Sequence, residues 1–378
     1  YPAASAGLAE AYLGQGRDAD ALRQWQILTA THPDWPGVFT GLGRVRLRQL
    51  AFDEARRAFL AQQAHSFDPE AEWYLAVLDS AVDLPRARAR LEGLASRTDL
   101  PPELAARLDY LQDTLDALPA GADTLAAARQ VGIAMVQAQE WPLAVYALES
   151  ARQALAAPDG ELLAFLGYAR ARAGAPALEL FERARQADPR SSLPLYFEGI
   201  YLREQKALQA AEDRLAQAIA LDPENAALFL EYARVREAMG DLATAEAAHL
   251  KAVELAGDDT AFRLALVDFY ARHSYRVREA AIPAARALVE AEPDNAEAYS
   301  LLGWLELLNG QSTAAEKSLR RALELDPELV SARYHLGRLL EAVGQTELAR
   351  REYQHVVDWD FAGIYRDDAL KALQRLNR

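Results

Sequence analysis

The stretch "RLAQAIALDPEN" (Arg214–Asn225) contains Leu-Asp-Pro-Glu near its end, and the same four residues recur in "SLRRALELDPEL" (Ser318–Leu329). The prolines of this phrase and of its variants elsewhere in the chain are Pro33, Pro69, Pro189, Pro223, Pro293 and Pro327. Three neighbouring pairs in this series, Pro33 with Pro69, Pro189 with Pro223, and Pro293 with Pro327, are separated by nearly the same interval. A constant period of about 34 residues indicates a tandem array of structural units rather than a catalytic motif, which is needed only once.

Each period contains two helical patterns. In "SLLGWLELLNG" (Ser300–Gly310) and "RYHLGRLLEAVG" (Arg333–Gly344), Leu-Gly is followed seven residues later by a glycine of the kind that ends a helix. A second helix follows, marked by a small residue and a large one four positions later: Ala21 with Trp25, Ala55 with Phe59, Ala315 with Leu319 and Ala349 with Tyr353. The proline phrase ends that helix, because the residue before a proline disfavours the helical conformation.

The order Leu-Gly, Ala, aromatic and Pro within each period resembles the tetratricopeptide repeat family. The resemblance is strongest for units that begin near Pro2, Pro36, Ser192, Ala226, Ala296 and Val330, and weaker near Leu125, Gly160 and Thr260. The unit near Thr260 has about two residues more than the repeat before Pro293. The resemblance implies an all-α, right-handed α-solenoid of about ten helix-turn-helix units.

We predict a single solenoid over residues 1–378. Its parts are N-terminal units (1–69), an irregular helical stretch (70–121), C-terminal units (122–360) and a capping helix (361–378). Within the irregular stretch, "RTDLPPEL" and "DALPAGAD" flank a predicted helix over Pro102–Leu118 that has no evident partner. The capping helix is predicted to turn Ile364, Leu370, Leu373 and Leu376 inward.

Composition excludes several classes of protein. The net charge of −15 and the pI near 5.0 oppose binding to nucleic acid and to anionic lipid surfaces. No apolar run is long enough to span a bilayer, and the absence of cysteine excludes disulfides and thiolate sites. Because the chain begins at Tyr1 rather than Met, we expect an excerpt or a processed product, so the sequence leaves open whether the protein is cytoplasmic or exported.

The sequence contains little that indicates catalysis. No two of its six histidines are three or four residues apart, so no helix face offers paired imidazoles to a zinc ion. "GLGRVR" (Gly41–Arg46) begins like a dinucleotide-binding motif but lacks the preceding strand and the third glycine. No Ser-His-Asp combination can be proposed from such an array. We therefore predict a protein that is not an enzyme, with no cofactor and no metal.

One stripe of residues along the first helices is the candidate binding surface. Taking the small residue of each first helix as reference, positions at four- and three-residue steps fall on one face of the helix. In the family that the sequence resembles, this face lines a concave groove for peptides or partner helices. The stripe residues are Arg44, Arg48, Arg129, Tyr168, Arg172, Tyr196, Arg203, Arg234, Arg272, Trp304, Tyr334 and Arg338.

Two interpretations of these arginines remain open. Arginine forks and aromatic rings suit the carboxylates and anchoring side chains of a protein or peptide partner, including an acidic one. Alternatively, the arginines pair with neighbouring acids such as Glu204, Glu237 and Glu341 and are merely solvated. The first interpretation predicts a non-catalytic protein-binding scaffold.

Two other functions are alternatives to the scaffold. The first is a self-assembling subunit that packs end to end through an uncapped N-terminal helix, with Ala6 and Leu13 in the contact. The second is the repeat region of a larger secretion, polysaccharide-assembly or regulatory protein.

Overall fold

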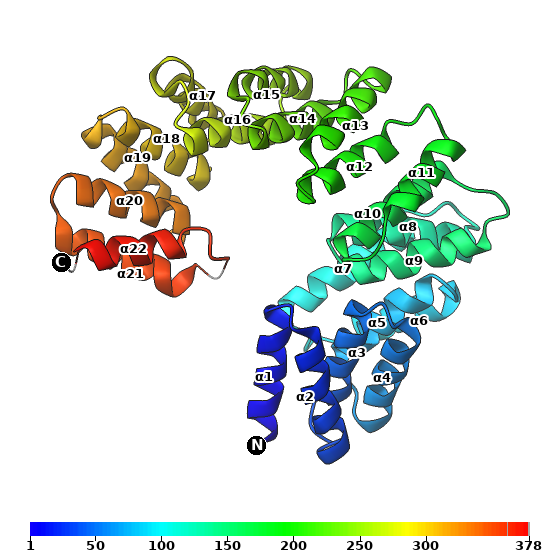
Figure 1. Ribbon diagram of the computed structural model, residues 1–378. Helices are drawn as coiled ribbons and strands as arrows, with labels where there is room; N and C mark the ends of the chain where they lie inside the picture. The colour runs from blue at the N-terminus through cyan, green and yellow to red at the C-terminus, as the bar shows by residue number, and fades with distance from the viewer. Residues whose placement is uncertain (361, 377–378) are drawn as a thin grey trace. The chain divides into compact units, whose positions relative to one another are not determined.

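The structure is a computed structural model that describes residues 1–360 and 362–376. This part of the chain is helical throughout and contains no strand, so the all-α prediction is confirmed (Figure 1). The chain forms two compact units, Tyr1–Leu221 (unit 1) and Asp222–Arg378 (unit 2), which are described separately below. The division of the chain into 1–69, 70–121, 122–360 and 361–378 stays a prediction.

Unit 1 consists of helix pairs and one helix outside the pairs. Its helices are α1 (Pro2–Gly14), α2 (Asp18–Thr31), α3 (Val38–Arg48), α4 (Phe52–His65), α5 (Pro69–Ser80), α6 (Leu84–Ala95), α7 (Pro102–Asp116), α8 (Thr124–Gln137), α9 (Trp141–Ala154), α10 (Gly160–Arg172), α11 (Leu178–Ala187), α12 (Leu193–Glu204) and α13 (Leu208–Leu221). The pairs are α1 with α2, α3 with α4, α5 with α6, α8 with α9, α10 with α11, and α12 with α13. Helix α7, the predicted helix without a partner, ends two residues earlier than expected and packs on α5, α6 and α8.

Unit 2 continues the same pattern. Its helices are α14 (Ala226–Ala238), α15 (Leu242–Ala256), α16 (Thr260–His273), the π-helix η1 (Val277–Ala281), α17 (Ile282–Ala291), α18 (Ala296–Leu308), α19 (Ser312–Leu325), α20 (Val330–Ala342), α21 (Thr346–Trp359) and α22 (Arg366–Leu376). Helix α14 packs on α15, α16 on α17, α18 on α19, and α20 on α21, while α22 packs on α21.

The two helices of a pair approach closely because a glycine of the first faces a large side chain of the second. A Cβ atom added at Gly303 would lie 2.6 Å from Cγ of Leu319, and one at Gly337 would lie 2.8 Å from Cε1 of Tyr353. The other such pairs are Gly43 with Phe59, Gly132 with Leu148, Gly167 with Phe181, and Gly199 with Leu215. The Leu-Gly and Ala-aromatic positions of the repeat therefore meet in space, as the sequence pattern predicts.

The extra residues in the unit near Thr260 form a modified turn. After α16 ends at His273, Ser274 and Arg276 adopt left-handed conformations with φ of 48° and 46°, and the π-helix η1 follows. A π-turn holds one more residue per turn than an α-helix, so it takes up part of an insertion without interrupting the helix. Helix α17 then resumes the pattern at Ile282.

The C-terminal capping helix is shorter than predicted. It begins at Arg366, because the carboxylate of Asp360 accepts hydrogen bonds from the backbone N–H groups of Tyr365 (2.6 Å) and Arg366 (2.9 Å). The helix buries Ala369 and Ala372 and partly buries Leu373 and Leu376. The predicted inward positions of Ile364 and Leu370 are wrong, since their side chains are 73% and 38% exposed. Ile364 precedes the helix and does not share its face. Residues 361, 377 and 378 of the predicted cap lie outside the described residues.

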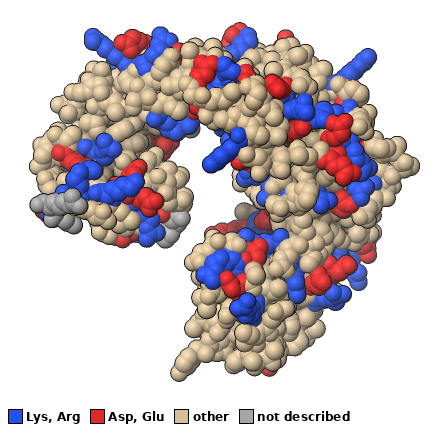
Figure 2. Space-filling view, in the orientation of Figure 1, with Lys and Arg blue, Asp and Glu red and all other residues tan. Residues whose placement is uncertain are grey.

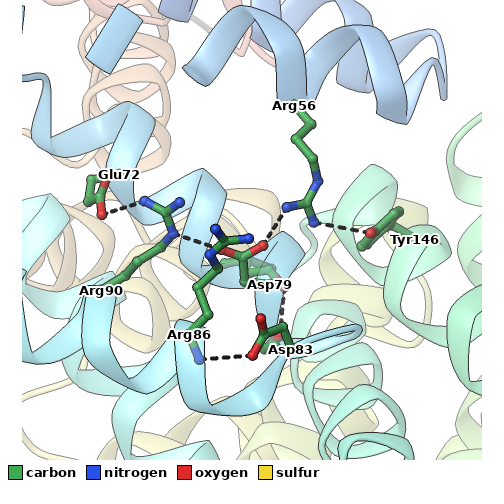
Figure 3. Close-up of polar contacts among 9 residues, drawn as sticks. Arg56, Glu72, Asp79, Asp83, Arg86, Arg90 and Tyr146 are labelled. Carbon is green, nitrogen blue, oxygen red and sulfur yellow. Dashed lines mark hydrogen bonds and ion pairs between the residues drawn. The ribbon is translucent and has the colours of Figure 1, made fainter. Parts of the chain in front are cut away.

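A buried group of charges joins four helices of unit 1 (Figure 3). The carboxylate of Asp79 on α5 is fully buried and accepts hydrogen bonds from Arg56 on α4 and from Nε of Arg90 on α6, the latter at 2.7 Å. Arg90 also donates to Glu72 at 2.6 Å, and Arg56 donates to the hydroxyl of Tyr146 on α9 at 3.3 Å. We call Arg56, Glu72, Asp79, Arg90 and Tyr146 the Asp79 network. It ties α9 to a helix 90 residues earlier in the sequence.

A candidate peptide-binding cavity

A cavity of about 570 Å³ lies within unit 1, in the size range of ligand sites. Its lining residues are Glu10, Leu13, Gly14, Asp18, Arg44, Leu47, Arg48, Tyr74, Gln139, Glu140, Trp141, Pro142, Leu143, Arg172 and Ala173. Three predicted stripe residues, Arg44, Arg48 and Arg172, are therefore brought to one hollow. We call it the unit 1 cavity.

The unit 1 cavity has walls from helices that are far apart in the sequence. One wall comes from α1, α2, α3 and α5, and the other from α9, α10 and the turns before α9 and after α10. Contacts of α9 with α3 and α5 join these walls, and the Asp79 network supports the same junction. Helices α6, α7 and α8 lie between the two walls in the sequence, and α6 and α7 belong to the stretch predicted to be irregular. Their packing therefore sets where α9 meets α3.

An aromatic group forms part of the second wall. Trp141 is the first residue of α9, and its ring meets Tyr168 edge to face with centroids 5.7 Å apart. The guanidinium of Arg172 lies 5.2 Å from the centroid of Trp141. Tyr168 also stacks on Phe197 at 4.5 Å, and Tyr196 lies 5.5 Å from the same ring. The stripe tyrosines of α10 and α12, Tyr168 and Tyr196, thus belong to one aromatic cluster.

Most stripe arginines form ion pairs with acids of the same chain. The pairs are Arg44 with Glu10 (3.1 Å), Arg48 with Asp18 (3.0 Å), Arg129 with Asp159 (2.7 Å), Arg172 with Glu204, Arg234 with Glu231 (2.9 Å), and Arg272 with Glu237 (3.1 Å) and Asp268 (2.7 Å). Figure 2 shows the same mixing, with basic and acidic side chains interspersed on the visible face. These contacts support the interpretation in which the arginines are paired and solvated. The remaining stripe arginine of unit 1, Arg203, lies on α12.

The stripe residues of unit 2 form a separate cluster. Trp304 stacks on His335 at 4.9 Å, and Arg338 lies 5.4 Å from the Trp304 ring. Arg338 donates to the Tyr334 hydroxyl at 3.2 Å, and no described carboxylate lies within ion-pair distance of it. A second cavity, of about 540 Å³, is lined by Tyr334, Arg338, Glu341, Ala342, Asp368, Lys371, Ala372 and Arg375. Partner binding by the twelve stripe residues stays a prediction.

The two residues predicted for an end-to-end contact pack within the first helix pair. Leu13 is only 5% exposed, and Ala6 packs against the cluster that contains it. Substituting Leu13 would therefore disturb α1 and α2 before it affected any contact with another molecule. Leu8 is a large apolar side chain of this helix that is exposed, at 42%. End-to-end association stays a prediction.

A buried polar chain in unit 2 is not indicated by the sequence pattern. Ser331 donates to Glu297 at 2.7 Å, and Ser300 lies 3.0 Å from both Ser331 and Nδ1 of His335. The two serines belong to the first helices α18 and α20, 31 residues apart, so no local motif indicates that they meet. Ser300 is fully buried and His335 is 4% exposed, so neither side chain is open to a substrate. The chain joins two neighbouring helix pairs.

His335 gives unit 2 a predicted sensitivity to acid. Burial lowers the pKa of His335 from 6.5 to about 3. Between these values the unfolded chain binds the proton that the folded chain does not, so stability is complete above pH 6.5 and decreases as the pH falls. We expect a loss of about 2 kcal/mol at pH 5. Urea unfolding at pH 7 and pH 5 measures the free energy of unfolding at each pH. Its decrease from pH 7 to pH 5 should be smaller in His335→Gln than in the unchanged protein, and an equal decrease would contradict the prediction.

The described residues hold no group of three or more His, Asp or Glu side chains arranged to bind a metal ion. Within residues 1–360 and 362–376, no helix combines the length and the apolar character that crossing a bilayer requires.

The comparisons with known proteins agree with the repeat pattern. A tetratricopeptide repeat family model matches residues 278–330 and 309–358. No curated protein matches the chain significantly. A tetratricopeptide repeat protein from Parabacteroides merdae is 15% identical, with a TM-score of 0.52 over 67% of this chain and 99% of its own.

Two further solved structures are similar at lower scores. Yeast Tom70 is 12% identical, with a TM-score of 0.49 over 100% of this chain and 96% of its own. YrrB, described as having an unusual peptide-binding site, is 18% identical, with a TM-score of 0.39 over 52% of this chain and 98% of its own. The family match shows tetratricopeptide repeats in residues 278–358, and the likeness to the Parabacteroides merdae protein shows that this chain shares the fold of a tetratricopeptide repeat protein.

Proposed function

We propose that this protein is a non-catalytic scaffold that binds a peptide or helix of a partner protein in the unit 1 cavity. The observation that carries the proposal is the lining, which combines the rings of Tyr74 and Trp141 with the guanidinium groups of Arg44, Arg48 and Arg172. Aromatic rings and arginine are the side chains most often found at the energetic centres of protein interfaces.

The construction of the cavity supports binding rather than catalysis. Its charged groups are held in ion pairs, and the buried Ser-His contact of unit 2 lies outside it. Most of its lining residues lie on packed helices, which holds their side chains in place before a partner arrives. Such preorganisation reduces the entropy cost of binding an extended peptide.

Peptides selected from a random 12-residue display library on the full chain test the proposal. We expect Trp141→Ala to weaken a selected peptide by about 10-fold or more, which corresponds to about 1.4 kcal/mol, because it removes the largest ring of the lining. Trp141→Phe should fall between Trp141→Ala and the unchanged protein. Circular dichroism of each variant separates lost binding from lost folding.

Trp359→Ala is the matched control, since Trp359 lies on α21, is 47% exposed and does not line the cavity. Fluorescence anisotropy should give an unchanged Kd for this variant. The proposal would be overturned if Trp141→Ala and Trp359→Ala lost peptide affinity equally, or if the selected peptides bound Trp141→Ala with an unchanged Kd.

A further inference from the structure

The charges that line the unit 1 cavity are already neutralised. Glu10 and Asp18 pair with Arg44 and Arg48, so two acids and two bases of the lining satisfy one another. The remaining acid, Glu140, pairs with Arg107 at 2.9 Å, and the remaining base, Arg172, pairs with Glu204. A charged group of a partner would have to displace one of these pairs, and exchanging one exposed ion pair for another yields little free energy.

Apolar side chains occupy the surface between these pairs. Leu13, Leu47 and Leu143 line the cavity but are at most 5% exposed. Among the apolar lining residues, Trp141 and Pro142 are partly exposed and provide open surface. An apolar side chain placed there removes its own surface and that of the lining from water, at about 25 cal/mol per Å² of buried apolar area. Displacing water from this surface is therefore the main source of affinity that the cavity offers.

Tyr74 supplies an unused hydrogen-bonding group in the same cavity. Its side chain is 7% exposed, and its ring stacks on Phe59 with centroids 4.8 Å apart and planes at 8°. The hydroxyl makes no hydrogen bond with any residue that the structure describes, and burial raises its pKa, which keeps it protonated. The hydroxyl oxygen is not fully enclosed by protein, so water or a ligand group can satisfy it.

We infer that the unit 1 cavity takes an uncharged apolar side chain of the partner peptide, and that the adjoining peptide amide hydrogen-bonds to the Tyr74 hydroxyl. The inference rests on the proposed binding function and specifies the chemistry of the bound segment. It differs from the sequence-based expectation of an acidic partner, because the arginines that suggested it are paired with Glu10, Asp18 and Glu204.

The selected library peptides test this chemistry in three ways. Their shared anchor position should hold an apolar residue, and replacing it by Glu should weaken binding by about 10-fold or more. Raising NaCl from 50 to 500 mM should change the Kd by less than about twofold, because no net charge is exchanged. Tyr74→Phe should weaken binding by about 3- to 10-fold, since it removes the hydroxyl and leaves the ring.

Tyr110→Phe is the matched control for the hydroxyl. Tyr110 lies on α7 outside the cavity, where its hydroxyl donates to the backbone oxygen of Ala134 at 3.2 Å. This variant should bind the peptides with an unchanged Kd.

The outcomes separate the inference from the function on which it rests. Acidic selected peptides, a Kd that rises steeply with salt, or equal Kd values for Tyr74→Phe and the unchanged protein would overturn the inference. The scaffold proposal would still stand in each case if Trp141→Ala abolished binding. If Trp141→Ala binds normally, the function itself fails, whatever the effect of Tyr74→Phe.

Discussion

Asp79→Ala is expected to destabilise unit 1 by about 3–5 kcal/mol, because it removes one partner from a buried ion-pair network. Asp79 is fully buried, and the side chains of Arg56 and Arg90 that bind it are 24% and 17% exposed. Without Asp79, Arg56 keeps only the Tyr146 hydroxyl, and Arg90 keeps only Glu72. Arg56 would then be a largely buried cation without a carboxylate partner.

Hydrogen exchange measured by mass spectrometry reports this loss locally. Peptides from α5 and α6 should exchange faster in Asp79→Ala, whereas peptides from α14 to α21 should be unaffected. Asp99→Ala is the control: Asp99 pairs with Arg97 at 2.7 Å, but its side chain is 67% exposed, so its loss should cost less than about 0.5 kcal/mol. Comparable effects of the two substitutions would show that burial of the network contributes nothing.

Much of the fold follows from the sequence because a repeat needs only local rules. The sequence separation between Gly303 and Leu319 is the same as that between Gly337 and Tyr353, and both pairs are in contact. A helix, a short turn and a second helix bring such positions together regardless of the rest of the chain. The repeat period reveals the two extra residues near Thr260, because it shows how long an insertion is. It does not show which conformation the insertion adopts, so the π-turn could not be predicted.

The candidate site follows from the sequence only in part. The period places Arg44, Arg48 and Arg172 on first helices, but it does not indicate that Trp141 faces them. That contact depends on how α5, α6 and α7 turn the following helices toward α3, and helical periodicity identifies a buried face without identifying the helix that covers it. The ion pairs of the stripe likewise join different helices, as with Arg172 and Glu204, 32 residues apart.

Phe59→Ala is expected to reduce the stability of unit 1 by about 3–5 kcal/mol, the usual range for a large aromatic side chain lost from a core. Phe59 is fully buried between Gly43 and the ring of Tyr74. The substitution should also weaken peptide binding, because it leaves Tyr74 without the ring on which it stacks. Phe67→Ala serves as the control: Phe67 is 50% exposed, and urea unfolding should register a loss below about 1 kcal/mol.

Gly43→Ala should lower the stability of the unchanged protein but raise the stability of the Phe59→Ala variant. With Phe59 present, the added methyl group would overlap the phenyl ring, and overpacking of this kind costs about 1–3 kcal/mol. In Phe59→Ala the same methyl enters the space that the ring has left, and alanine is favoured over glycine within a helix by about 0.5–1 kcal/mol. A double-mutant cycle measured by urea unfolding should therefore show the double variant to be more stable than Phe59→Ala alone. If Gly43→Ala stabilised both the unchanged protein and Phe59→Ala, the added methyl group would not meet the Phe59 ring. The close approach of α3 and α4 at Gly43 would then be wrong.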